Sequence, residues 1–311
     1  MATRISVSPK SVLRVLLLIV VMLSLTSLVG HLFNYYVVVE DFLVKELQES
    51  FVRLFSVDGE GNIPTWYSSV TLLFSSALLA VIAVSTKHSG GRYFYHWGAL
   101  ALIFFYLSLD EGVQIHEMAI KPMRLILQAS GLLDAGWGGL LYGWGGLLYY
   151  AWVIPGAVCT VIFAMAYVRF LMHLPPKTRW LFTMAGALYV GGAIGVESLS
   201  GQYAAQYGEE RIGYHALTTA EELLEMLGVA VFVYALLEYM RSQLTTVEFH
   251  IYSRENLPGL RLRTHRAREQ RRLSATGAEA PQGYVEGGVT HVNAGIGGAR
   301  HDLGDVERGA S

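Results

Sequence analysis

The sequence predicts an all-α membrane protein, a polytopic bundle of six transmembrane helices with both termini cytoplasmic. Hydrophobic residues make up 53% of its 311 residues and charged residues only 15%, whereas a soluble domain of this length carries more charge. Six apolar runs also approach the roughly 20 residues that a helix needs to cross a bilayer. These runs cover residues 15–39, 67–86, 96–118, 147–170, 180–199 and 216–240.

The distribution of Lys and Arg predicts how these helices are oriented. With the N-terminus in the cytoplasm, 18 of the 23 basic residues fall on the inner side and five on the outer side. This bias agrees with the positive-inside rule for every loop. The first apolar run is longer than the core of a signal peptide, about 7 to 15 residues. We therefore expect it to remain in the protein as a helix.

Three regions follow from this topology. Residues 1–14 form a cytoplasmic segment, residues 15–240 the six-helix domain, and residues 241–311 a cytoplasmic tail that is first basic and then disordered. The Arg-rich stretch 261–272 suits anionic lipid headgroups, and the Gly, Ala and Ser content beyond it favours disorder. The bilayer is the expected partner, and nothing indicates nucleic acid. The one cysteine, Cys159, cannot form an intrachain disulfide.

Between the first two runs, residues 40–55 place apolar side chains at helical spacing among charges. This pattern predicts an interfacial helix on the outer surface. The third outer loop repeats the sequence GWGGLLY, at 136–142 and again at 143–149. The repeat suits a Gly-rich interfacial entry to the fourth helix, and a flexible lid over a polar site is the alternative.

Two features concern helix shape and packing. Pro155 falls within the fourth apolar run and should kink its helix, because proline lacks a hydrogen-bond donor. In the fifth run, Ala187, Gly191 and Gly195 recur every four residues. Such a stripe of small residues permits close contact with a neighbouring helix.

Ionisable residues in three of the apolar runs are the main indication of a site. A carboxylate at the centre of a spanning helix costs roughly 2.5 to 3.5 kcal/mol on insertion scales, so a group of them is normally paired, hydrated or metal-bound. By the predicted topology, the ionisable residues that indicate the site all fall in the outer half of the membrane. The residues are Asp110, Glu111, His116 and Glu117 in the third run, Glu197 in the fifth, and Glu221, Glu222 and Glu225 in the sixth.

Helical geometry limits how the acids of the third run can act together. Asp110 and Glu117 share one face but lie about 10.5 Å apart along the axis, and Glu111 and His116 project to opposite flanks. A regular helix therefore cannot bring all four to one ion, although Gly112 could allow a local break. On the sixth helix, an arc of roughly 80° holds an imidazole, a hydroxyl and two carboxylates. These are His215, Thr218, Glu222 and Glu225.

A simpler interpretation exists for part of the sixth helix. Thr218 or Thr219 could cap its N-terminus, with Glu221 or Glu222 as the capping-box acid. That interpretation leaves Glu225, deeper in the helix, without a role. His31 in the first run is expected to be a hydrogen-bonded or interfacial histidine rather than a ligand.

Carboxylates with a few histidines and no thiolate suit a divalent Zn, Mn or Fe ion. We expect Asp110, Glu111 and Glu197 to act as acid and base or as supporting groups in a membrane-embedded enzyme for a lipid-soluble substrate. No organic cofactor is predicted. The expected metal ligands are His116, Glu117, Glu221, Glu222, Glu225 and His215.

Two alternatives remain beside the metal hypothesis. The same carboxylates would share protons in a proton- or cation-coupled transporter, or pair with a partner's basic residues in a structural or assembly subunit. The inner halves of the helices are almost wholly apolar, which favours a one-sided pocket that opens outward. An ion path at the interface of a homo-oligomer is a further alternative.

Four stretches resemble a group of uncharacterised bacterial multi-pass membrane proteins, some of them labelled multidrug transporters. They are LSLDEGVQIHE at 107–117, WVIPGA at 152–157, AGALYVGGAIGVE at 185–197 and TTAEELLEMLG at 218–228. The resemblance implies an integral-membrane family whose motifs coincide with the polar residues above, and we expect the protein to lie in the bacterial inner membrane. It implies no established activity.

Overall fold

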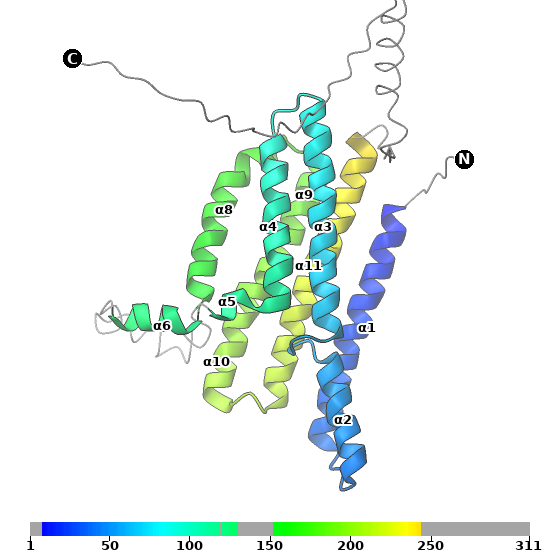
Figure 1. Ribbon diagram of the computed structural model, residues 1–311, viewed down its shortest axis with the longest axis vertical. Coiled ribbons are helices and arrows are strands. Elements are labelled where there is room, and N and C mark those ends of the chain that lie inside the picture. The colour runs from blue at the N-terminus through cyan, green and yellow to red at the C-terminus, as the bar shows by residue number, and fades with distance from the viewer. Residues whose placement is uncertain (1–7, 119, 130–151, 244–311) are drawn as a thin grey trace, which may run out of the picture. The chain divides into compact units, whose positions relative to one another are not determined.

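The regular structure of this chain is helical throughout the residues that the computed structural model describes, which are 8–118, 120–129 and 152–243. The repeated GWGGLLY and the tail beyond residue 243 lie outside these residues. Figure 1 shows the helices. They are α1 (Pro9–Tyr36), α2 (Phe42–Phe55), α3 (Ile63–His88), α4 (Phe94–Val113), α5 (Ile115–Met118), α6 (Ile120–Ala129), α8 (Val153–His173), α9 (Pro176–Val190), the π-helix η2 (Gly191–Val196), α10 (Glu197–Tyr207) and α11 (Ile212–Gln243).

Five helical stretches in the described residues are long and apolar enough to cross a membrane. They match five of the six predicted runs and cover Pro9–Tyr36, Ile63–His88, Val153–His173, Pro176–Tyr207 and Ile212–Gln243. The remaining run corresponds to α4, which packs along α3 and has 20 residues. α4 is not among the five, and its last turn carries Asp110 and Glu111. The chain is thus a helical, apolar, membrane-type protein.

Successive long helices alternate in direction, so the turns α3–α4 and α8–α9 lie at the same end of the bundle as the start of α1 and the finish of α11 (Figure 1). α11 is the central helix, because it packs against α1, α3, α9, η2 and α10. Its Val233, Ala235 and Leu236 are fully buried.

Aromatic and aliphatic side chains fill the half of the bundle nearest the α3–α4 and α8–α9 turns. Trp97 of α4 packs edge-on against Phe170 of α8, with ring centroids 4.9 Å apart, and Phe104 stacks on Phe232 of α11 at 4.5 Å. We call this cluster the apolar plug. Its buried members include Leu79, Ile82, Trp97, Leu100, Phe170, Phe182, Phe232 and Leu236.

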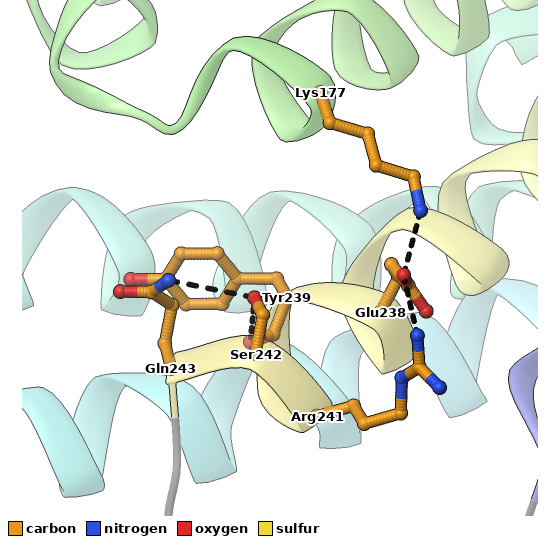
Figure 2. Close-up of polar contacts among 6 residues, drawn as sticks. All are labelled: Lys177, Glu238, Tyr239, Arg241, Ser242 and Gln243. Atoms are coloured by element: carbon orange, nitrogen blue, oxygen red, sulfur yellow. Dashed lines mark hydrogen bonds and ion pairs between the residues drawn. The ribbon is translucent and has the colours of Figure 1, made fainter.

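At the plug end, an ionic contact joins α9 to α11. The Glu238 carboxylate accepts hydrogen bonds from Lys177 Nζ at 2.6 Å and from Arg241 Nη2 at 2.9 Å (Figure 2). Both basic side chains are largely exposed, so the contact orients the helix ends and adds little stability.

Two predictions about local shape are wrong. Pro155 lies in the first turn of α8. A backbone N–H in the first turn has no acceptor within the helix, so a proline there removes no helical hydrogen bond and does not kink the helix. α2 is amphipathic, and Phe42, Leu43 and Leu47 are exposed, but it does not lie across the bundle end as an interfacial helix would. It runs along the bundle axis beside α1 (Figure 1).

Glycines set the close contact between α11 and the α9–η2 segment, but they are not the predicted ones. A Cβ added at Gly192 would lie 2.7 Å from the Glu221 carbonyl oxygen and 2.8 Å from Glu225 Cγ, and one at Gly228 would lie 2.8 Å from the Tyr189 nitrogen. Gly191 and Gly195 of the predicted stripe face open space, with nothing within 4 Å of such a Cβ.

We expect Gly192→Ala to destabilise the bundle by about 1 to 3 kcal/mol, because the added methyl group forces α11 away from η2. The measurement is the thermal unfolding midpoint of the purified protein in detergent. Gly195→Ala is the matched control, since it makes the same change in the same π-helix without a contact. Equal midpoints for the two variants would contradict this packing.

Candidate functional site

A cavity of about 420 Å³ lies in the half of the bundle opposite the apolar plug. Its walls come from α3, α4, α5, α8, α9, η2, α10 and α11, and from the segment 57–59 between α2 and α3. Seven carboxyl side chains line it, and none of the described Lys or Arg side chains does. The seven are Asp58, Asp110, Glu111, Glu197, Glu221, Glu222 and Glu225.

The structure therefore brings together six of the acids singled out from the sequence, with His116 beside them. They come from three separate stretches of chain, α4–α5, α10 and α11. The side chain of Glu117 lies outside the described part of the structure. His215 does not line the cavity.

The third predicted helix is broken, and the break places His116 in the site. Gln114 adopts the left-handed conformation, with φ 53° and ψ 51°, so α4 ends there and α5 begins. The Asp110 carboxylate then accepts a hydrogen bond from the His116 backbone N–H at 2.9 Å and lies 2.8 Å from its Nδ1. Of the two possibilities that the sequence left open, a regular helix and a local break near Gly112, the structure has the break, two residues beyond Gly112 at Gln114.

Trp152, at the start of α8, joins this pair to α10. Its indole N–H donates a hydrogen bond to Glu197 Oε1 at 2.7 Å, and its ring centroid lies 4.8 Å from that of His116. Glu197 is 7% exposed. Sequence reasoning took Trp152 only as part of a matching stretch and missed Asp58 and Tyr189, which also line the cavity.

α11 supplies three of the acids, and they are not capping residues. The helix begins at Ile212, so Thr218 and Thr219 lie in its second turn, where their hydroxyls donate to the backbone carbonyl of His215. The capping interpretation is therefore wrong. Glu221 accepts a hydrogen bond from the buried Ser200 Oγ of α10 at 3.2 Å.

His215 faces α1 instead. Its ring stacks on that of His31 with centroids 3.9 Å apart and an interplanar angle of 15°. His31 also hydrogen-bonds Ser56 Oγ through Nε2 at 3.0 Å, as expected for a hydrogen-bonded histidine. Although the helical wheel places His215 on one arc with Glu222 and Glu225, His215 does not line the cavity.

The arrangement gives little support to a metal site. No group of three or more His, Cys, Asp or Glu side chains in the described ranges is positioned to hold one metal ion. The physical reason is that three of the carboxyl groups, which lie on different walls of the cavity, form hydrogen bonds with separate donor side chains. Asp110 is oriented by His116, Glu197 by Trp152 and Glu221 by Ser200.

No Lys or Arg side chain of the described residues lies in the cavity wall, where it could neutralise the acids. Arg211 is exposed and is not part of the lining. The side chain of Arg124 lies outside the described residues. The cavity is thus anionic or protonated, with His116 as the basic side chain in its described lining.

The break at Gln114 gives a test of the site geometry. A β-branched residue is strained in the left-handed conformation, whereas glycine adopts it freely. We expect Gln114→Val to be less stable than Gln114→Gly by about 1 to 2 kcal/mol, as measured by thermal unfolding. If valine were tolerated as well as glycine, the helix would be continuous and His116 would not reach Asp110.

The comparisons with known proteins concern the same core. A family model described as Domain of unknown function (DUF8692) matches residues 12–239, a range that includes all seven acids of the cavity. Neither the curated proteins nor the solved structures gave a match. Since the matched range covers most of the chain, the protein belongs to the DUF8692 family.

Proposed function

We propose that this protein crosses a bacterial inner membrane six times, with α4 as the sixth spanning helix and both termini in the cytoplasm. In this membrane it binds a cationic solute in the acidic cavity in exchange for protons, as a proton-coupled cation transporter does. The Lys and Arg distribution and the alternating helices support the orientation (Figure 1). The cavity then opens toward the periplasm.

The observation that carries the proposal is a cavity lined by seven carboxyl groups and by none of the described Lys or Arg side chains. Asp58 is exposed, but the other six are buried or half-buried among apolar helices. Ionised carboxylates in such surroundings repel one another and lose hydration, so they cannot all stay charged without a counter-ion. Such a set either holds protons or holds a cation. Binding one therefore displaces the other.

The shape of the cavity favours a small organic solute over a bare ion. Its volume of about 420 Å³ falls within the range of small-molecule pockets, roughly 300 to 1,000 Å³. Leu107, Val190 and Ile194 add apolar wall between the acids. A ligand that carries both a positive charge and an apolar body fits this mixed lining.

The other half of the bundle is closed in this structure. The apolar plug fills the space between α3, α4, α8, α9 and α11, so no polar lining continues from the cavity through the described helices. Binding from one side is what this state allows. Transport would require a second state in which the plug helices separate.

The proposal is tested by a pair of ions of nearly equal shape and opposite charge. We expect saturable binding of tetraphenylphosphonium to the purified protein in nanodiscs, and none of tetraphenylborate. Glu222 lines the cavity without a hydrogen bond to another described side chain. Glu222→Gln should therefore weaken tetraphenylphosphonium binding by about tenfold, or ~1.4 kcal/mol.

Glu60→Gln is the matched control, because Glu60 is an exposed acid two residues from Asp58 and outside the cavity lining. Its affinity for tetraphenylphosphonium should equal that of the wild type. Equal binding of both ions, or wild-type binding of tetraphenylphosphonium by Glu222→Gln, would show partition into the lipid and not a site. An equal loss in both variants would contradict a specific role of Glu222. The alternative metal hypothesis requires stoichiometric metal in the purified protein, lost in the double variant His116→Ala, Glu222→Ala.

A further inference from the structure

Trp152 is an aromatic side chain of the cavity wall that residues of two other elements, α5 and α10, hold in place. Its indole N–H is fixed by Glu197 of α10 at 2.7 Å. Its ring lies against His116 of α5 at 4.8 Å between centroids, with an angle of 57° between the planes. The hydrogen bond and the ring contact together determine the orientation of the indole.

Gly156, one turn further along α8, makes room for this orientation. A Cβ at Gly156 would lie 2.8 Å from Trp152 Cζ3 and 3.1 Å from its Cε3, so the ring occupies the space that a side chain would take. Gly156, Cys159 and Thr160 of α8 also line the cavity. The lack of a side chain at Gly156 therefore lets the indole pack against α8 while it borders the cavity.

A tryptophan ring in an acidic, partly apolar cavity has a specific chemical use. Its π-face attracts cations, most strongly those that shed water easily, and the attraction grows when the site is desolvated. Quaternary ammonium, phosphonium and delocalised aromatic cations have this property. A small hydrated inorganic ion does not, because it would lose its water without gaining oxygen ligands from the indole.

Building on the cation site proposed above, we propose that Trp152 is its specificity-determining residue and that the ligand is a weakly hydrated organic cation. The carboxyl groups supply the charge, and the indole face selects the kind of cation. The hydrogen bond to Glu197 and the space at Gly156 hold the indole in the cavity wall.

The decisive experiment is site-specific replacement of Trp152 by tryptophan carrying one, two and then three fluorine atoms on its ring. Fluorination weakens the π-face and leaves the shape and the N–H donor in place. We expect the affinity for tetraphenylphosphonium to fall step by step, by about tenfold over the series. A structural role of Trp152 alone would leave the affinity unchanged.

Three conventional variants keep the inference testable if the fluorinated proteins are poorly produced. Trp152→Phe keeps an aromatic face and loses the hydrogen bond, so it should bind more tightly than Trp152→Ala. Gly156→Ala displaces the indole without changing any group that carries charge, and should weaken binding as Trp152→Ala does.

The outcomes separate this inference from the proposed function. If fluorination and Trp152→Ala leave the affinity unchanged while Glu222→Gln still weakens it, Trp152 does not select the ligand and the cation site stands. If the wild-type protein shows no saturable tetraphenylphosphonium binding, the cation site itself is refuted, and this inference with it.

Discussion

Carboxyl groups enclosed by apolar helices need protons or a counter-ion, and this requirement explains much of the structure around them. Seven acids surround a single cavity, and the described part of the chain supplies neither a Lys nor an Arg to its lining. Instead, neutral or weakly basic donors hold the carboxyl groups individually, such as the indole of Trp152 and the hydroxyl of Ser200. These hydrogen bonds stabilise and orient the acids without cancelling their charge, which leaves the site able to exchange a proton for a cation.

The helices depart from regular geometry where they reach the cavity. α4 ends at a left-handed Gln114, and the fifth spanning stretch becomes a π-helix immediately before Glu197. Both departures change the direction of side chains by amounts that a continuous α-helix cannot. Such local irregularities cost stability and are common at functional sites. The opposite half of the bundle, where aromatic rings interlock, has regular helices.

Much of the fold follows from composition and periodicity. Apolar runs located five membrane-length helices, because length and hydropathy decide these elements. The spacing of apolar side chains among charges located the amphipathic α2. That Asp110, Glu197 and Glu222 line one cavity could also be anticipated, because the predicted topology places all three in the outer half of the membrane. What the sequence could not show were features that depend on tertiary contact. A break in this helix was considered at Gly112, but its position at Gln114 was not predicted, because left-handed backbone is not typical of glutamine.

The same limit applies to packing and to the site's other members. Spacing of four residues pointed to Gly191 and Gly195, yet the π-helix shifts the contact to Gly192. The helical wheel placed His215 with the acids, but its ring faces α1 and stacks on His31. No sequence pattern singled out Trp152, and its contacts depend on two partners distant in the sequence, His116 and Glu197. Asp58 lies on a loop, so no helical periodicity in the sequence points to it as a residue of the site.

The most direct test of the central claim is to count the protons released when a cation binds. Isothermal titration of tetraphenylphosphonium into the protein, repeated in buffers of different ionisation enthalpy at one pH, gives this number from the slope of the observed heat. If cation and protons compete for the same carboxyl groups, about one proton leaves for each cation bound, and Glu222→Gln lowers that number. Binding with no proton release at any pH between 5 and 8 would contradict the exchange.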